Sequence, residues 1–415
     1  MLTLIPARMA DPMRQLTDIL MVHTYYQERG GEDLSFEAER RALEHAGVTV
    51  HTYVDTNYRV DTLGGLKAGI RCVWSGEAKS DIQRIIRETR PQLMHVQNSF
   101  PMMSPSIYYA ARAEGVPVIQ SIRNYRLLCP RAIFYRNNRV CEDCMGKKFA
   151  WPGVLHACYR GSRAGTAAIA AMQTIHNSLG SWSRKVDHFI ALSAFGRQKL
   201  IEGGLPAEKI SVAPNFVFPD PGVSEEDRKF ILFVGRLSEE KGIATMLRAW
   251  EQVHQDIPLV IAGRGPSSDI VEEAAQRLEG VTWLGAQTID NIYSLMGQAA
   301  AVLFPSEWYE TFGRVAIEAY SRSTPVIASD LGAISELVED GRTGLLFEPG
   351  NADSLANAAR AIWNDLHSAR QMGIRGRSLF DRHYTVSQHL ETIDDIYSQV
   401  TGGLRIPRRE TGMPT

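Results

Sequence analysis

Short apolar segments alternate with helical segments along almost the whole chain, and this alternation limits the possible folds most strongly. In the first half, the apolar run 18–24 (DILMVHT) predicts a strand, and 35–47 (SFEAERRALEHAG) predicts a helix with Ser35 as N-cap and Gly47 at its end. In the second half, 230–237 (FILFVGRL) and 258–263 (PLVIAG) predict strands in the same way. Short apolar strands between helices are typical of parallel sheets in α/β proteins.

The chain of 415 residues is too long for one compact core, which predicts two domains. We expect two Rossmann-like, doubly wound parallel-sheet domains that face a central cleft, where ligands bind outside the carboxyl ends of the strands. The expected parts are a tail 1–17, a first domain 18–218 with an irregular insertion 129–160, a linker 219–228, a second domain 229–382, a helix 383–402 that packs back on the first domain, and a tail 403–415 that looks disordered.

Charge and hydropathy limit the partners. The net charge of −2 gives no basic field, so nucleic acid is not an expected partner. No apolar run approaches the roughly 20 residues that a membrane span needs. The N-terminal segment is interrupted by Arg8, Asp11 and Arg14, which is unlike a signal peptide, and we therefore expect a cytoplasmic protein.

The segment 234–243 (VGRLSEEKGI) has the composition of an anion site. Gly235 allows a tight turn after the strand, and Arg236 and Lys241 then stand at the edge where the next helix begins. The two cations are suited to clamping a diphosphate, because a guanidinium offers a planar fork of donors. The alternative is a solvated pair beside the neighbouring glutamates. Gly263, in a second glycine-rich turn, permits a close backbone approach at the same edge.

Two glutamates stand eight apart in 309–320 (YETFGRVAIEAY), and the second lies in an otherwise apolar run. Glu310 is expected in a loop, and Glu318 on the second turn of a helix that begins near Gly313. A buried carboxylate needs a partner. For Glu318 the partner is either a ligand with vicinal hydroxyls or a neighbouring Arg or Lys inside the fold.

Four of the five cysteines fall within 30 residues, with one C-x-x-C pair between two flanking cysteines. This spacing allows a structural zinc site that would hold an irregular loop together. The alternative is four reduced thiols in an insertion. The candidate ligands are Cys129, Cys141, Cys144 and Cys158.

An Ala-rich helix is expected over 161–182, with basic residues at both ends. Such a helix either lies against a membrane surface, where it would help to reach a lipid-linked acceptor, or packs inside the protein with its basic ends in water.

The second half strongly resembles the GT4-type retaining glycosyltransferases. The resemblance rests on VGRLSEEKGI, on the two glutamates of ETFGRVAIE (310–318), and on TPVIASDLGAISELVEDGRTGLLFEPGN (324–351). It implies the GT-B architecture and a diphosphate held by Arg236 and Lys241. It also implies that Glu318 binds the donor ribose and that Glu310 contacts the transferred sugar. The donor-binding set implied is Gly235, Arg236, Lys241, Gly263, Glu310, Phe312, Gly313, Glu318, Gly30 and Gly31.

The segment 98–130 resembles a bacterial branch of this family that is often tied to surface polysaccharide assembly. Here Arg123 stands where the branch often has a histidine at the reaction centre. The catalytic set implied is therefore Glu310, Arg236, Lys241 and Arg123.

The resemblance implies transfer of a hexose from a nucleoside-diphosphate sugar to a glycan or polyprenyl-linked acceptor, with retention of configuration. No cofactor is expected for catalysis, and any zinc would be structural. The expected location is the cytoplasm, including the inner face of the membrane. Two alternatives stay open: a sugar-nucleotide epimerase of the same architecture, and a non-catalytic nucleotide-sugar-binding protein.

Overall fold

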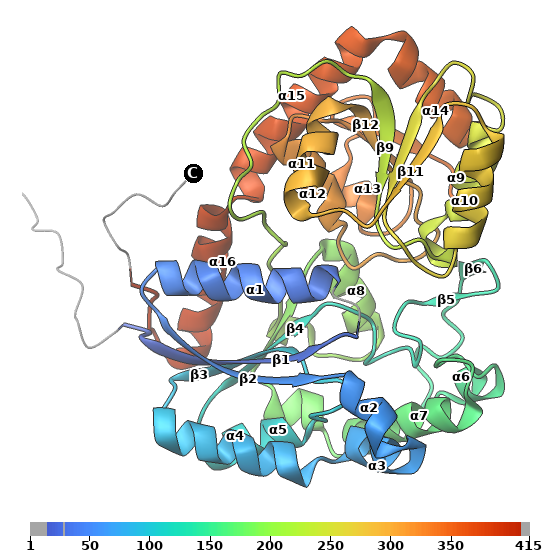
Figure 1. The fold of residues 1–415 in the computed structure, drawn as a ribbon. Helices are drawn as coiled ribbons and strands as arrows, with labels where there is room; N and C mark the ends of the chain where they lie inside the picture. The colour runs from blue at the N-terminus through green and yellow to red at the C-terminus, as the bar shows by residue number, and fades with distance from the viewer. Residues whose placement is uncertain (1–14, 28–29, 408–415) are drawn as a thin grey trace, which may run out of the picture. The chain divides into compact units, whose positions relative to one another are not determined.

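The computed structural model describes residues 15–27 and 30–407, which form two six-stranded sheets and one short hairpin (Figure 1). The ladders that join β1, β2, β3 and β4 are parallel, as are all those of the second sheet. The predicted class, two parallel-sheet α/β domains, is confirmed.

The second sheet has the strand order β11-β10-β9-β12-β13-β14. Counted from β9, this is the order 3-2-1-4-5-6 of a doubly wound Rossmann sheet. The strands stay parallel, and the direction of winding reverses between β9 and β12. The strands are β9 Phe230–Val234, β10 Leu259–Ala262, β11 Val281–Gly285, β12 Ala299–Phe304, β13 Val326–Ser329 and β14 Gly344–Phe347.

Helices cover both faces of this sheet, because each face carries its own apolar cluster. One cluster includes residues of α9, α10 and α14, and the other includes residues of α11, α12, α13 and α15 (Figure 1). The helices are α9 Ile243–Trp250, α10 Ser268–Arg277, α11 Ile289–Gln298, α12 Arg314–Ser321, α13 Ile334–Leu337, α14 Ala352–Asn364 and α15 Leu366–His383.

The first sheet has the order β2-β1-β3-β4-β7-β8, so its direction of winding reverses between β1 and β3. Its strands are β1 Asp18–Tyr25, β2 Thr49–Thr56, β3 Leu93–Asn98, β4 Val118–Ile122, β7 His188–Ala191 and β8 Ile210–Val212. The helices of this half are α1 Gly31–His45, α2 Tyr58–Leu63, α3 Gly65–Val73, α4 Gly76–Thr89, α5 Ser106–Ala113 and α8 Ala194–Glu202. Figure 1 shows α1 on one face of the sheet and α4 and α5 on the other.

The segment from Cys129 to Lys185 is mostly irregular at its start and helical at its end. It contains the hairpin β5 Tyr135–Arg136 and β6 Arg139–Val140, the short helix α6 Trp151–Leu155, and α7 Arg163–Ser178, followed by a π-helical turn Ser181–Lys185. Helix α7 lies within the predicted range 161–182.

The start of α1 differs from the prediction. Ser35 is not the N-cap, because the helix begins at Gly31 and the Ser35 hydroxyl donates to Gly31 O at 2.8 Å, inside the helix. Asp33 supports the helix start instead: its carboxylate accepts from Gly30 N at 3.1 Å and contacts His23 Nε2 at 2.7 Å. The predicted stop holds, since Gly47 follows the C-cap with φ 95°.

Contacts divide the described chain into two compact units. The first holds the chain up to Ser121, the segment Leu179–Phe189 and the chain from Leu390 onward; the second holds Ile122–Ser178 and Ile190–His389. Helix α16, Val386–Thr401, therefore ends in the first unit, where Tyr397 OH lies 2.7 Å from His95 Nδ1.

The ends of the described chain are ordered further than the sequence predicted. Leu16 is fully buried, and its N–H donates to Arg405 O at 2.7 Å. Ile406 N donates to Asp394 Oδ1 at 2.6 Å. The disordered tail predicted from 403 onward is therefore wrong for residues 403–407, and the predicted tail 1–17 is part of the fold from residue 15; residues 1–14 and 408–415 lie outside the described residues.

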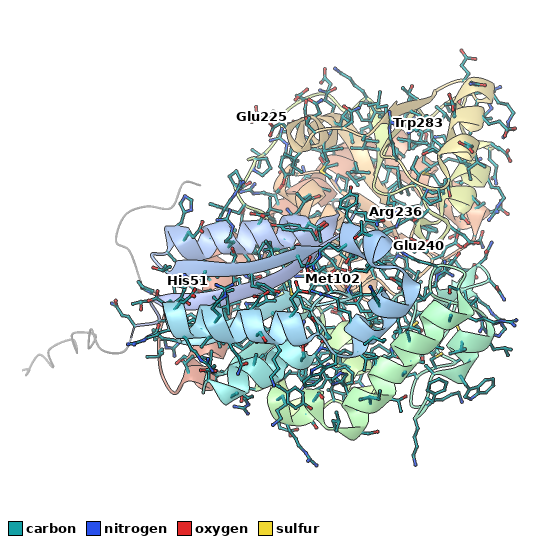
Figure 2. All side chains as sticks on the ribbon, turned by 60° about the horizontal axis from the view of Figure 1, so that its bottom comes forward. His51, Met102, Glu225, Arg236, Glu240 and Trp283 are labelled. Carbon is teal, nitrogen blue, oxygen red and sulfur yellow. The ribbon has the colours of Figure 1, made fainter. Side chains whose placement is uncertain are left out.

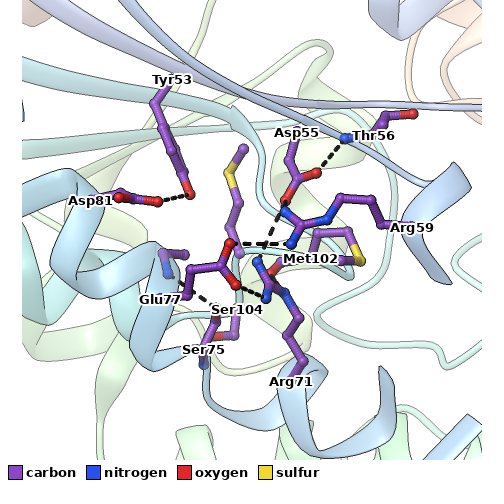
Figure 3. Close-up of polar contacts among 12 residues, drawn as sticks. Tyr53, Asp55, Thr56, Arg59, Arg71, Ser75, Glu77, Asp81, Met102 and Ser104 are labelled. Carbon is purple, nitrogen blue, oxygen red and sulfur yellow. Dashed lines mark hydrogen bonds and ion pairs between the residues drawn. The ribbon is translucent and has the colours of Figure 1, made fainter. Parts of the chain in front are cut away.

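A charged network lies in the first unit, between the end of β2 and helices α2 to α4 (Figure 3). The buried Asp55 accepts from Arg59 Nη1 at 2.9 Å and lies 3.6 Å from Arg71 Nη2. Arg71 also pairs with Glu77 and donates to Met102 O at 2.7 Å. Two arginines and two carboxylates thus connect three helices to a loop after β3.

Over the described ranges, the chain contains no helix that is both long and apolar enough to cross a bilayer.

Candidate functional site

The predicted site residues of the second half lie on loops that leave the carboxyl ends of β9 and β12. These strands are neighbours in the sheet, and the direction of winding reverses between them. Gly235 and Arg236 follow β9 directly, and Glu310 lies in the loop between β12 and α12. In doubly wound sheets this reversal point is where ligands bind.

Lys241 and Glu310 form an ion pair across the two loops. Glu310 is 7% exposed, and one of its carboxylate oxygens carries the contacts. That atom, Oε1, accepts from Lys241 Nζ at 2.6 Å, from Ser306 Oγ at 2.7 Å and from Trp308 Nε1 at 2.9 Å. The ammonium also lies 5.4 Å from the Trp308 ring centre, a cation–π distance. Neither Ser306 nor Trp308 was predicted from the sequence as a site residue, although both lie within four residues of Glu310.

Three further contacts join the loop after β12 to the turn that carries Lys241 and to the start of α9. Glu307 N donates to Glu240 O at 2.9 Å, and Thr245 Oγ1 donates to Glu307 Oε1 at 2.5 Å. Gly242, with φ 70°, lies so close to the other loop that a Cβ would come 1.9 Å from Pro305 O. Lys241 therefore stands on a short 3-10 turn, Glu239–Lys241, that is fixed against the loop carrying its partner.

The two glycine-rich turns also touch. A Cβ at Gly263, whose φ is 150°, would lie 1.8 Å from Gly235 O. The predicted close approach at Gly263 therefore exists, and what approaches is the backbone of the neighbouring loop. Gly235 N in turn donates to Ala262 O at 3.1 Å.

Arg236 differs from Lys241 in its surroundings. It is exposed, on the loop after β9, where Figure 2 labels it. Lys241 is paired with Glu310, a residue 69 positions away, and not with the neighbouring glutamates. The joint clamp of the two cations on a diphosphate stays a prediction.

Glu318 has a partner inside the fold. Helix α12 begins at Arg314 with Gly313 as N-cap, as predicted, and Glu318 is 5% exposed on its second turn. Arg314 Nε donates to Glu318 Oε1 at 2.7 Å. Although burial alone would lower the pKa of Arg314, the charge of Glu318 and the hydrogen bonds of the cluster raise it. Of the two partners considered for Glu318, the neighbouring arginine is present, so the burial of this carboxylate does not by itself indicate a ligand. The ribose contact that the resemblance implies stays a prediction.

Phe312 and Gly313 complete the loop before α12. The Phe312 side chain is 3% exposed and packs edge-to-face against Tyr384, with ring centres 5.9 Å apart. This side chain is therefore part of the apolar core and is not available to a ligand. Gly313 has φ 119°, and its place as N-cap puts the first N–H groups of α12 at the same edge as Glu310.

Arg123 belongs to the same unit as these loops. It is 7% exposed, and its Nη1 donates to Asn215 Oδ1 at 2.7 Å. Its backbone oxygen accepts from Thr311 Oγ1 at 3.0 Å, so Arg123 contacts the residue that follows Glu310 in the chain. The neighbouring Tyr125 hydroxyl donates to Glu310 O at 3.3 Å; burial and the charge of Glu310 raise the pKa of this tyrosine.

Gly30 and Gly31 lie in the first unit. Of these two residues implied for donor binding, Gly30 is the N-cap of α1, and Gly31 begins its first turn. Both glycines follow β1, at the carboxyl side of the first sheet. Their implied role in donor binding stays a prediction.

The four clustered cysteines line one small cavity together with Pro130, Arg131, Tyr135, Arg136 and Gly153. All are free thiols. Burial raises the pKa of Cys144 to about 11 and also raises that of Cys158. Among residues 15–27 and 30–407, no group of three or more His, Cys, Asp or Glu side chains has the arrangement of a finished metal site.

Curated relatives match parts of the chain. The alpha-maltose-1-phosphate synthase of Mycolicibacterium smegmatis is 32% identical over 203 residues, which is 44% of this chain and 52% of that protein. The glycogen synthase of Mycobacterium tuberculosis is 27% identical over 61% of this chain and 64% of that protein. The chain thus matches between about half and two thirds of the length of these relatives.

Solved structures share the fold over nearly the whole chain. The Anabaena protein HepE in complex with UDP superposes with a TM-score of 0.68 and 18% identity, over 92% of this chain and 100% of that one. The sucrose-phosphate synthase of Thermosynechococcus elongatus gives a TM-score of 0.68 and 17% identity, over 93% and 99%.

Two family descriptions together account for most of the sequence. "Glycosyl transferase 4-like domain" matches residues 19–215, and "Glycosyl transferases group 1" matches residues 218–379. The two matches follow the two sheets, and the second contains Arg236, Lys241, Glu310 and Glu318. The chain belongs to the group 1 glycosyltransferases of the GT4 type, which have the GT-B fold.

Proposed function

We propose that the protein is a retaining glycosyltransferase that moves a hexose from a nucleoside-diphosphate sugar to a glycan or lipid-linked acceptor in cell-surface polysaccharide assembly. The observation that carries the proposal is the Lys241–Glu310 pair at the reversal point of the second sheet, with Arg236 exposed beside it. Family membership supports the same reaction class.

The proposed diphosphate site is built from charges on one edge of the sheet. Arg236 and Lys241 follow β9, and the first N–H groups of α12 begin after Gly313. Cations and helix N-termini stabilise the negative charge that grows on a leaving phosphate as the glycosidic bond lengthens. Lys241 can reach such a phosphate only by sharing its ammonium between the phosphate and Glu310, because Glu310 lies 2.6 Å away.

Glu310 is proposed to contact the transferred sugar. Its Oε1 is occupied by three donors, so its second carboxylate oxygen is the atom that would accept from a sugar hydroxyl. The proposed ribose contact of Glu318 uses Oε2 in the same way, because Oε1 accepts from Arg314. Retention through front-face attack, with the leaving phosphate as base, follows from the family resemblance.

The acceptor side of the proposal includes contact with the inner face of a membrane. Helix α7 does not support this, because it buries an apolar stripe that includes Ile169 and Met172. The support comes from the segment before it, which includes α6 and in which Phe149, Trp151 and Leu155 are 39%, 55% and 54% exposed. Exposed Lys147, Lys148 and Arg160 flank these residues. Apolar side chains among cations suit an anionic lipid surface.

The donor is tested with UDP-, GDP- and ADP-sugars, first by the rise in Tm on binding and then by turnover with lipid-linked and glycan acceptors. Lys241→Met is compared with Lys229→Met, which removes the same charge just before the amino end of β9, at the opposite edge of the sheet. We expect only Lys241→Met to lose turnover, by about 100-fold or more. Equal loss in both variants, or a donor epimerised without transfer, would refute the proposal, and donor binding without turnover would indicate a binding protein.

The role of Glu318 needs a variant that keeps the helix charge-balanced. Glu318→Ala alone leaves the Arg314 guanidinium buried without its carboxylate, so loss of activity could come from misfolding. The double variant Arg314→Met/Glu318→Met removes both charges at similar volume. We expect it to fold and to raise the KM for the donor, and an unchanged donor KM would remove Glu318 from the donor site.

Membrane contact is tested by sedimentation with vesicles of phosphatidylglycerol or phosphatidylcholine. Binding to the anionic vesicles alone, reduced at least several-fold by Trp151→Ala, is expected. Trp74→Ala, at a tryptophan that is 40% exposed elsewhere, is the control. Equal binding by Trp151→Ala and the intact protein would exclude the loop as the contact.

A further inference from the structure

Four cysteines that are spread over 30 residues come together around one cavity. Cys129, Cys141, Cys144 and Cys158 all line it, and its volume is about 10 Å3, close to what one water molecule needs. The fifth cysteine, Cys72, lies in α3 and does not line this cavity. The cavity thus brings four sulfur-containing side chains to one small space.

The cavity is also lined by Arg131 and Arg136. Four thiolates around one divalent cation leave a net charge of −2 (2 − 4). Two guanidinium groups at the same cavity offset part of that charge and favour the deprotonated sulfurs. Arg136 is held in place by Asp143, whose carboxylate accepts from it at 2.6 Å.

The backbone around the cavity is unusually strained. Of the nine non-glycine residues with positive φ in the described chain, six lie between 132 and 160. Two of the six, Asn137 and Asn138, form the hairpin turn, where asparagine adopts this conformation readily. For the other four, such conformations cost about 1–3 kcal/mol each and persist only where other contacts enforce them. The regular structure nearby is slight: a hairpin of two-residue strands and the five-residue helix α6. A cross-link between the four cysteines would hold these short elements together, in addition to the buried side chains of Phe134 and Tyr135.

We propose that these four cysteines bind one structural Zn2+ that fixes residues 129–158. The metal bonds to four thiolates in a tetrahedron, and each thiol gives up its proton on binding, so that Zn2+ and four thiols yield the complex and four H+. Because the described thiols are not yet arranged as a finished site, binding draws the side chains inward. Gly153 leaves the necessary room: a Cβ there would lie 3.3 Å from Cys144 Sγ.

The zinc site is independent of the proposed transfer reaction. It lies in an irregular segment and supplies no group to Lys241 or Glu310. Its consequence is to hold the segment that presents Trp151, the first residue of α6, which follows Cys144 by seven residues. Loss of zinc and loss of transferase activity are therefore separately measurable.

The test starts from the full chain, produced in zinc-supplemented medium and purified without chelators. We expect about one zinc per chain by elemental analysis and release of that zinc when a mercurial reagent blocks the thiols. Replacement by Co2+ should give the thiolate charge-transfer and tetrahedral absorption bands, a readout that needs no variant. Cys144→Ser should lose the zinc, and Cys72→Ser should keep it.

The main rival is a pair of disulfides. Denatured, metal-free protein would then show one free thiol instead of five. That result, or absence of zinc in both purified and zinc-reconstituted intact protein, would overturn the proposal. Retention of zinc by Cys144→Ser would overturn the assignment of the ligands.

Discussion

The ion pair between Lys241 and Glu310 gives the sharpest quantitative prediction. At 2.6 Å and an effective dielectric constant of 20, the Coulomb attraction is about 6 kcal/mol before the cost of removing both charges from water. Glu310 is nearly buried, while a quarter of the Lys241 side chain is exposed, which weakens the pair. Glu310 also keeps two other donors, Ser306 and Trp308, when the lysine is removed. We therefore expect Lys241→Met to lower the free energy of unfolding by about 2 kcal/mol, well below the gross attraction.

A double-mutant cycle isolates the pair. Lys241→Met, Glu310→Gln and the double variant are unfolded in urea and followed by tryptophan fluorescence and by circular dichroism, whose transitions must coincide for a two-state treatment. The double variant should be more stable than the sum of the single losses predicts, by about 1–2 kcal/mol. If the two single effects add within about 0.5 kcal/mol, the two loops are not coupled through this pair.

Other parts of the structure give further predictions. Gly263→Ala should cost about 3 kcal/mol, because its Cβ would meet Gly235 O at 1.8 Å, whereas Gly76→Ala, with nothing within 4 Å, should cost little; equal urea midpoints would contradict the backbone contact. Arg71→Met should lower the free energy of unfolding by about 2 kcal/mol, since the buried Asp55 then keeps only one arginine, and a loss under about 0.5 kcal/mol would contradict the network of Figure 3. The hydrogen bond from Arg71 lowers the pKa of Glu77, so its stabilisation is present above the ordinary pKa of 4.5 and is lost as the pH falls through the folded-state pKa. Because Glu77 is half exposed, Glu77→Gln should flatten the stability profile between pH 5 and 3 by less than about 1 kcal/mol, and an unchanged profile would contradict the assignment.

Local sequence patterns were sufficient to predict the strands and the loops that carry the site. Apolar runs such as 18–24 and 230–237 are short and end at polar or glycine residues, and each one became a strand. The loop after β12 was predicted for the same reason, because Gly313 separates Glu310 from the helix. These features depend on neighbours in the sequence, which the sequence displays directly.

Helix starts were harder to predict because two signals competed. Ser35 has the composition of an N-cap, yet Gly30 and the acidic pair Glu32 and Asp33 mark an earlier start. The earlier start also gives Asp33 a buried contact with His23 on β1. A tertiary contact of this kind decides between two local signals, and it cannot be seen in the sequence.

Pairs of residues that are distant in the sequence could not be predicted. Lys241 and Glu310 are the clearest case, since they stand 69 positions apart. Glu318 is different, because its partner Arg314 is only four residues earlier on the same helix. Residues at this spacing lie on one face of a helix, so the ion pair could have been predicted from the sequence together with the helix. A buried acid on a helix should therefore be checked for a basic residue three or four positions away before a ligand is inferred. By this rule, Glu310 indicates a ligand site more strongly than Glu318 does. The cation that pairs with Glu310 comes from a different loop, at the edge of the sheet where a ligand would bind.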